Sequence, residues 1–182
     1  GFDGLGLRGN DSSPVTAEDV VVTADDRLGA VGGGLAIMLE VVLPLFAAMN
    51  AGCSVGSMER AVGGTLAHAS ATRHQHLGSS LADLPTIRAY IARMKIALDQ
   101  ARLLLDDTVS AMETGRADTM LRVLQSKAAA GESATVVTDL AMRVCGGAAF
   151  RKELGVERAF RDARAATVMA PTTDQLYDFL GK

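Results

Sequence analysis

The residues best suited to bind a metal or a ligand in this sequence are three histidines, and a pair of glycines that follows a long helical stretch. A zinc site needs three or four His, Cys, Asp or Glu ligands at suitable spacing. His68, His74 and His76 have no such partners, so we expect solvated loop histidines and no metal site. Gly146 and Gly147 fit a helix C-terminus, and they also fit a backbone that a ligand approaches closely.

The stretch "RDARAATVMAPTTDQL", residues 161–176, changes abruptly from charged to small apolar side chains. A surface helix normally ends at a glycine or a polar residue. Here the charged run passes into Val168, Met169, Ala170 and Pro171 before a threonine starts the next helix. Ordinary helix termination does not account for this pattern.

Helical periodicity dominates the chain from Leu35 onward. Pro44 should bend the first helix, because proline lacks a backbone donor and clashes with the preceding turn. Helices are expected over residues 35–72, 83–113, 119–145, 156–160 and 173–180. The third should point these residues inward: Leu121, Leu124, Ala128, Val136 and Leu140. The pattern predicts a mainly α fold, an antiparallel four-helix bundle preceded by a short β/loop segment.

Residues 1–31 differ from the rest of the chain, since they are rich in Gly, Asp and Ser and contain the β-branched run "VVVT". One or two strands cannot form a stable sheet alone. We therefore divide the chain into a β-type segment, 1–31, and a helical-bundle domain, 32–182. We expect the chain to be the back part of a larger protein.

Composition excludes several classes of function. Acidic residues outnumber basic ones by 21 to 18, and the basic residues are scattered, so nucleic acid is not an expected partner. The run "LAIMLEVVLPLFAAM" contains Glu40 and Pro44 and is shorter than the ~20 apolar residues of a membrane span, so we predict a buried helix. Cys53 and Cys145 do not make a disulfide framework, and no secretory signal is present, so a cytoplasmic location is expected.

Three segments, in the same order and spacing, resemble the C-terminal half of the acyl-CoA dehydrogenase family of flavoenzymes. They are "GLRGNDSSPVTAEDVVV", "RHQHLGSSLADLPTIRAYIARM" and "RVCGGAAFRKELGVERAFRDAR". The third is the most specific, because its glycine pair is followed at family spacing by the "ERAFRDAR" run. The resemblance implies that residues 1–31 are a remnant of a middle β-domain. It also implies FAD as cofactor, acyl-CoA as substrate, and a homotetramer or a heteromer with related subunits.

The resemblance assigns cofactor contacts position by position. Gly146 and Gly147 match the glycine pair that lets backbone approach FAD, and Arg143 falls where the family usually has a glutamine near the adenine. Thr172 and Asp174 fall in the segment that touches the flavin and the pyrophosphate. Asp174 departs from the family pattern, since a carboxylate does not favour a phosphate without a compensating base or helix N-terminus.

The loop after the first helix carries a second departure from the family pattern. His74 aligns with the family's phosphate-binding arginine, and Leu77 aligns with its phenylalanine. Arg73 lies one residue away, so a slip of one position would restore an arginine for FAD.

The family's catalytic base is the third and most important departure. Family dehydrogenases remove an α-proton with a glutamate in the signature "[YM]-E-G-T", where this chain has Met169, Ala170, Pro171 and Thr172. Some members keep the glutamate on the first long helix, at the position of Val42. Glu40 is close in sequence, but two residues are about 200° apart around a helix. The resemblance thus implies a pocket loop without its usual base.

Three functions remain open from the sequence. The first is an FAD-dependent acyl-CoA dehydrogenase-type oxidoreductase whose base lies elsewhere or is missing. The second is a flavin-dependent monooxygenase or N-hydroxylase of the same fold, which needs no α-proton base. The third is a non-catalytic subunit that completes the pocket of an active partner.

Overall fold

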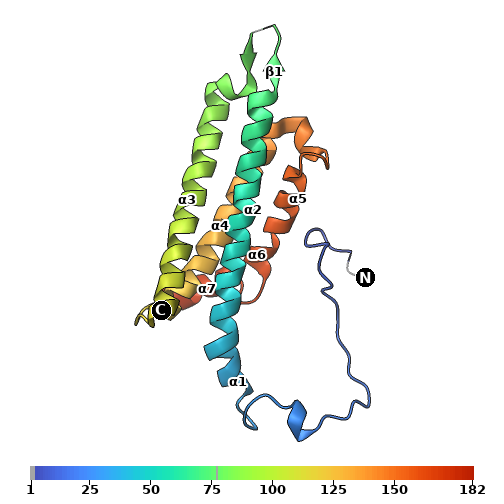
Figure 1. Ribbon diagram of the computed structural model, residues 1–182, viewed down its shortest axis with the longest axis vertical. Coiled ribbons are helices and arrows are strands. Elements are labelled where there is room, and N and C mark those ends of the chain that lie inside the picture. The colour runs from blue at the N-terminus through green and yellow to red at the C-terminus, as the bar shows by residue number, and fades with distance from the viewer. Residues whose placement is uncertain (1–2, 77) are drawn as a thin grey trace.

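The computed structural model describes residues 3–76 and 78–182 and is mainly helical (Figure 1). Three long helices run antiparallel, and a short fourth helix lies beside them, so the predicted antiparallel bundle is confirmed. The bundle helices are α2 Leu43–Ala71, α3 Pro85–Thr114, α4 Thr119–Cys145 and α5 Val156–Ala163. The other helical elements are η1 Ala24–Asp26, α1 Gly34–Ile37, η2 Met38–Val42, η3 Leu81–Asp83, η4 Gly146–Phe150, α6 Ala165–Val168 and α7 Thr173–Gly181.

The sequence signals at the helix ends explain these boundaries. Pro85 begins α3, where its missing N–H would have no helical partner anyway. Gly115 ends α3 in the left-handed conformation, at φ 62°, with its N–H donating to the Ala111 carbonyl. Gly146 ends α4 at φ 54°. Asp83 lies before α3 in the η3 turn, where its carboxylate accepts from the N–H and the hydroxyl of Ser80.

The core is built from small side chains on α4. Thirteen residues of α4 are buried, and α4 packs against α2, α3 and α5. Alanines such as Ala130, Ala134 and Ala141 face Ala51 and Ala61 within one apolar cluster. Because alanine adds so little bulk, the helix backbones can approach closely, and Met58 and Met94 fill the remaining gaps.

The N-terminal end of the long helix is exposed, which corrects the expectation that residues 35–49 are buried. Within that stretch Ala47 alone is fully buried, whereas Leu35 and Met49 are 67% and 63% exposed. The helix continues past the end of its bundle neighbours (Figure 1). Hydropathy indicates that these apolar side chains favour burial. It does not indicate whether they are buried by other residues of this chain or by another domain or subunit. By length and composition alone the continuous helix, 34–71, could also cross a membrane, although nine residues of α2 are buried in the bundle.

The expected effect of Pro44 takes a specific form. Residues 38–42 form a π turn in which the Leu43 N–H donates to the Met38 carbonyl, five residues back. Pro44 has no N–H to continue the regular ladder, so the helix widens in the turn before it.

The prediction of a strand at "VVVT" is wrong, because these described residues form no strand. Residues 20–23 are exposed and form no ladder, because no neighbouring strand is present to pair with them. The strands that do form are β1 Arg73–His74 and β2 Ser79–Ser80, an antiparallel pair at the tip of the hairpin between α2 and α3. Residues 11–33 form an extended arm that leaves the bundle and returns to α1 (Figure 1).

Two side chains expected inside α4 lie outside. Leu121 and Val136 are 44% and 45% exposed, while Val123 and Val137 are fully buried. The α4 helix contacts neighbours on several sides, so its buried arc is broad and apolar periodicity alone does not fix its centre. Cys53 is exposed and Cys145 is buried.

The core can be tested with a matched pair of substitutions on α3. Met94 is fully buried and Ile96 is 58% exposed. Met94→Ala should lower the free energy of unfolding by about 2–5 kcal/mol, because it removes buried apolar surface and leaves a cavity. Ile96→Ala should change it by less than about 1 kcal/mol. Urea unfolding of both variants provides the measurement, and equal losses would contradict this packing.

A charged cluster ties α3 to the start of α4. Arg116 donates two hydrogen bonds to the carboxylate of Asp107, both of 2.8 Å, and one from Nε to Asp118 Oδ1 at 2.5 Å. Arg122 Nε donates to Asp118 Oδ2 at 2.9 Å. The Arg116 guanidinium is the main reason that the pKa values of Asp107 and Asp118 lie below the usual aspartate range.

This cluster predicts a specific dependence of stability on pH. A lowered folded-state pKa stabilises the fold above the unfolded value, near 3.8, and the stabilisation is lost as pH falls through the folded value. Arg116→Gln should therefore reduce stability at pH 7, and its difference from wild type should shrink below about pH 4. Arg93→Gln, at an exposed site on α3, is the control. A difference that stays constant down to pH 2 would contradict the role given to Arg116.

Candidate functional site

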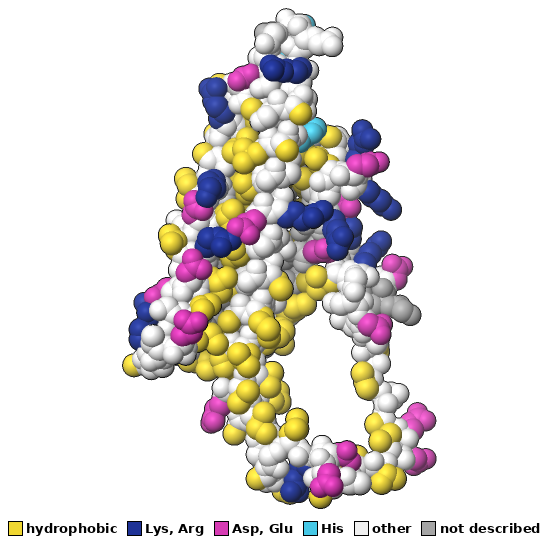
Figure 2. Space-filling model, viewed as in Figure 1, with side chains coloured by type: hydrophobic (Ala, Val, Ile, Leu, Met, Phe, Trp, Pro, Cys, Tyr) yellow, Lys and Arg dark blue, Asp and Glu magenta, His cyan; other side chains and the backbone are white. Residues whose placement is uncertain are grey.

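An apolar pocket lies at the end of the bundle where α2 begins and α7 ends. Its volume is about 640 Å³. It is lined by Met38, Leu39, Val42, Leu43, Phe46, Met120, Leu124, Ala170, Pro171 and Phe179, which come from four separate parts of the chain. None of these described lining residues is ionisable. Hydrophobic side chains also cover the neighbouring surface (Figure 2).

Val42 and Ala170 line this same apolar pocket, although they lie 128 positions apart in the chain. Both were singled out from the sequence as positions of the family's base. Glu40 lies in the π turn and is exposed, and it is not among the pocket residues even though Leu39 and Val42 are. This arrangement follows from helical geometry, because Glu40 points around the helix from Val42.

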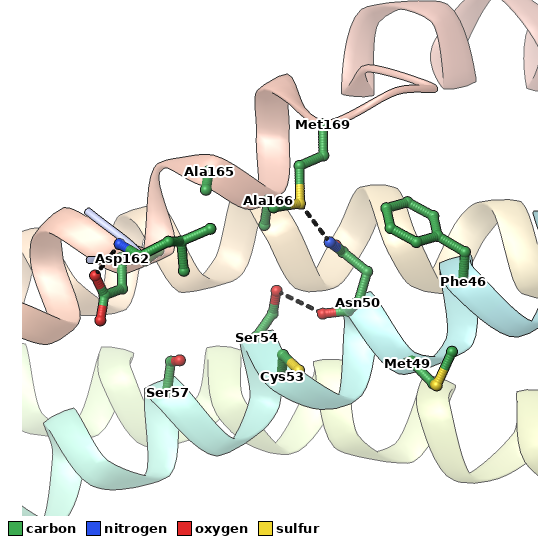
Figure 3. Close-up of a pocket in the computed structure, with 12 residues that line it drawn as sticks. Phe46, Met49, Asn50, Cys53, Ser54, Ser57, Asp162, Ala165, Ala166 and Met169 are labelled. Carbon is green, nitrogen blue, oxygen red and sulfur yellow. Dashed lines mark hydrogen bonds between the residues drawn. The ribbon is translucent and has the colours of Figure 1, made fainter. Parts of the chain in front are cut away.

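A second pocket, of about 300 Å³, lies between α2 and the segment from α5 to Met169 (Figure 3). Phe46 borders both pockets, so they are adjacent. Asn50 reaches across this pocket, and its Nδ2 donates to the Met169 sulfur at 3.2 Å. Its Oδ1 is buried and has no hydrogen-bond partner among the described residues. This orphaned acceptor is available to a donor on a ligand.

The N-terminal segment covers one side of this pocket. The Leu7 N–H donates to Asp162 Oδ1 at 2.6 Å, and Arg161 Nη1 donates to the Leu5 carbonyl at 2.7 Å. Arg161 is oriented in turn by Glu157, which accepts from its Nε at 2.8 Å. Arg161 and Asp162 therefore clamp this segment to α5.

The clamp can be tested at Gly6, whose backbone lies directly on α5. A Cβ at Gly6 would lie 2.5 Å from the Arg161 carbonyl oxygen, whereas a Cβ at Gly9 meets nothing within 4 Å. Gly6→Ala should therefore release the segment and speed hydrogen exchange at the Leu7 N–H. Gly9→Ala should leave that exchange unchanged. Equal protection of Leu7 in the two variants would show that the segment does not lie on α5 as described.

The sequence-predicted cofactor residues divide into two groups. Arg73 and His74 lie in β1, at the same end of the bundle as Arg143, Gly146 and Gly147. Thr172 and Asp174 lie at the start of α7, beside Ala170 at the opposite end (Figure 1). The helix that links the two ends, α4, has 27 residues and is about 40 Å long at a rise of 1.5 Å per residue.

At the hairpin end, the glycine pair leaves open space next to its backbone. A Cβ at either Gly146 or Gly147 would meet nothing within 4 Å. Arg143 Nε donates to Asp139 at 2.9 Å, and this carboxylate is the main cause that raises the pKa of Arg143. His74 Nε2 is buried without a partner among the described residues.

Arg73 and His74 cannot both face one ligand. They are consecutive residues of a strand, so their side chains point to opposite sides, and Arg73 is exposed while His74 is half-buried. Leu77, aligned with the family's phenylalanine, lies outside the described residues.

At the other end, Thr172 is the N-cap of α7. Its hydroxyl accepts from the Gln175 N–H at 3.3 Å, and the Gln175 side chain accepts from the Thr172 N–H at 2.9 Å. Asp174 lies exposed in the first turn, where a helix N-terminus favours a negative charge. The hydroxyl of Thr173 is buried with no partner among the described residues.

Sequence reasoning missed Lys127 and most of the aromatic and methionine side chains around Ala170. Lys127 is 1% exposed and is the ninth residue of α4. The available signal was a lone lysine next to Ala128, a position that was expected to face inward. Phe46, Met120 and Phe179 come from distant segments, so no local pattern links them to the pocket.

Comparison with known proteins identifies the family. Residues 32–182 match the family model of the acyl-CoA dehydrogenase C-terminal domain. The chain belongs to the acyl-CoA dehydrogenase family. Members of this family are FAD-dependent oxidoreductases, and the match covers the bundle and both groups of site residues.

Individual relatives agree with this assignment. The chain is 29% identical over 171 residues to cyclohex-1-ene-1-carbonyl-CoA dehydrogenase of Geobacter metallireducens, which covers 92% of the chain and 43% of the relative. It is 30% identical to an L-prolyl-[peptidyl-carrier protein] dehydrogenase of Pseudomonas fluorescens, over all of the chain and 47% of that protein. A crystal structure of a putative acyl-CoA dehydrogenase from Mycobacterium smegmatis superposes with a TM-score of 0.91 at 22% identity, over 99% of the chain and 46% of that structure. The chain therefore spans less than half the length of these relatives.

Proposed function

We propose that this chain forms the bundle half of a thioester pocket in an FAD-dependent, dehydrogenase-type oxidoreductase acting on acyl-CoA or a related acyl thioester. The observation that carries the proposal is the apolar pocket lined by both Val42 and Ala170. An acyl chain is apolar, and a pocket of this size with hydrophobic walls suits it. The two relatives named above act on a CoA thioester and a carrier-protein thioester, so the thioester is the shared chemistry.

The missing carboxylate defines the second part of the proposal. Removing the α-proton of a thioester needs a base whose pKa is raised by an apolar site toward neutrality. Ala170 stands at the usual position of that base, and its methyl group cannot accept a proton. The same pocket offers a second position at Val42, which is also apolar. Glu40 is exposed and not among the pocket residues, so we infer that this chain supplies the pocket but not its base.

The residues at both bundle ends fit a flavin dinucleotide that other parts of the protein complete. The open backbone at Gly146 and Gly147, with Arg143 and Arg73 or His74, would hold the nucleotide portion. Thr172 and Asp174 would lie near the flavin portion, beside Ala170. The chemistry that bound FAD supplies is acceptance of a hydride from the substrate β-carbon. Because the two groups lie toward opposite ends of the bundle, we propose that they serve different FAD molecules in a homotetramer or heteromer.

The proposal also assigns a role to residues 1–31. They are the last part of a middle β-domain, in which Leu5 and Leu7 are held to α5 by Arg161 and Asp162. The cover for exposed Leu35 and Met49 then comes from another domain or subunit. The cytoplasm remains the proposed location.

A second candidate function is supported by the same observation, that no described pocket residue can act as a base. A flavin-dependent monooxygenase or N-hydroxylase of the same fold needs no carboxylate at position 170, because oxygen and reduced flavin supply the reactivity. Oxygen consumption coupled to a hydroxylated product would favour this function. A non-catalytic subunit would show neither this reaction nor flavin reduction by thioesters.

The proposal predicts a gain of activity from Ala170→Glu in the complete, flavin-loaded protein. A carboxylate in this pocket would have a raised pKa and could act as the general base. The rate of anaerobic flavin reduction by acyl-CoA should rise by roughly 10²-fold or more. Stopped-flow absorbance of the flavin provides the measurement.

Ala170→Gln is the matched control, because glutamine has the same shape and cannot act as the base. It should leave the rate at the wild-type level. Similar rates in Ala170→Glu and Ala170→Gln would mean that position 170 does not face the reacting carbon of a thioester.

A further inference from the structure

Lys127 is a buried cation in the first third of α4 that the proposed reaction does not use. Its side chain is 1% exposed, and its ammonium donates to three backbone carbonyls. These are Ala166 at 3.3 Å, Met169 at 3.0 Å and Pro171 at 2.8 Å. All three carbonyls belong to the short segment between α5 and α7, about 40 positions further along the chain.

The three carbonyls that accept from Lys127 lie on both sides of Ala170 in the chain. Ala166 lies in α6, four residues before Ala170. Met169 and Pro171 are the residues directly before and after Ala170. Ala170 and Pro171 line the larger pocket, and Ala166 and Met169 line the smaller one. A single ammonium therefore holds the backbone that forms one wall of both pockets.

Few other described hydrogen bonds hold this segment. The Met169 N–H donates to the Ala165 carbonyl at 3.0 Å, and Thr172 makes its capping contacts with Gln175. Asn50 contacts the Met169 sulfur, not the backbone. The carbonyls of Met169 and Pro171 have Lys127 as their hydrogen-bond donor.

Retaining a lysine here carries a cost. Burial lowers the pKa of the Lys127 ammonium, and no carboxylate in the described part of the chain offsets it. An apolar side chain of similar length would avoid this cost but would leave the three carbonyls without their donor. The segment also lies against α4 near this site, since a Cβ at Gly131, one turn along α4, would lie at an ordinary van der Waals distance of 3.6 Å from Ala166. Lys127 is thus suited to hold the segment, not merely to fill space.

We propose that Lys127 is the positioning residue of the pocket wall: its ammonium fixes residues 166–171 and so determines where position 170 faces the pocket. It does not touch the reacting atoms. The segment-holding part of the proposal rests on the hydrogen bonds alone. The effect on the reaction rests on the proposed function.

The first test measures the segment directly in the complete, flavin-loaded protein. Lys127→Met keeps the length of the side chain and removes its donor, and Lys152→Met is the control at an exposed lysine. Hydrogen exchange at the Met169 and Thr172 amides should be at least tenfold faster in Lys127→Met. Exchange within α3 should not change, and Lys152→Met should match wild type. Wild-type protection of Met169 and Thr172 in Lys127→Met would overturn the proposal.

Lys127→Gln covers the case in which Lys127→Met does not fold. Glutamine retains two N–H donors on a shorter side chain, so it should give faster exchange at the same two amides. Wild-type protection in this variant would overturn the proposal. Lys127→Arg keeps the charge and should restore most of the protection.

The second test separates positioning from general stability. In the Ala170→Glu background, Lys127→Met should lower the limiting rate of flavin reduction at saturating acyl-CoA at least tenfold, with a smaller change in the dissociation constant. Lys127→Arg should recover most of that rate. An unchanged limiting rate would overturn the positioning role. If Ala170→Glu alone is inactive, the proposed function fails, and the exchange measurement still decides for Lys127.

Discussion

Close packing of small side chains on α4 is the constraint on which the rest of this structure depends. With alanines and a glycine on its buried faces, α4 can pack against α2, α3, α5 and α6 at once. The centre of the bundle is therefore filled with backbone and mostly short side chains. The space for ligands lies at the ends and along the edge of the bundle.

This constraint explains why the site residues lie so far apart. At one end, α4 stops at Gly146, and the backbone there is open because two consecutive residues lack a Cβ. At the other end, the segment from α6 to α7 crosses the start of α4 and brings Ala170 against α2. Lys127 connects the packed middle to this end, since its backbone belongs to the core of α4 and its ammonium reaches the pocket wall. The core of the bundle and the pocket wall are therefore joined directly by the hydrogen bonds of Lys127.

Sequence reasoning recovered the helices and their order because these follow from local signals. The glycines at 115 and 146 and the proline at 85 are read directly from the chain, and the three- and four-residue spacing fixes the long helices. It failed where the answer depends on what lies next to a segment. The "VVVT" run has strand character and no strand to pair with, and residues 35–49 are apolar and exposed. An apolar side chain has the same hydropathy whether it is buried within its own chain or against another domain or subunit.

For the site, the family pattern identified Ala170 and Val42 separately, and the structure adds that they line one pocket. The roles of Lys127 and Phe46 could not be read from sequence, because each depends on contacts made across more than 30 positions. The absence of an ionisable group among the described pocket residues is likewise a three-dimensional fact. Glu40 is close in the chain and remains outside.

The measurement that tests the central claim most directly is an anaerobic titration of the complete, flavin-loaded wild-type protein with a series of acyl-CoA thioesters. The claim is that the pocket accepts a thioester but lacks a base. The account predicts a saturable perturbation of the flavin spectrum, while the colour of the oxidised flavin persists. Rapid bleaching within the first turnovers would contradict it, because a working base would then reach the substrate α-carbon.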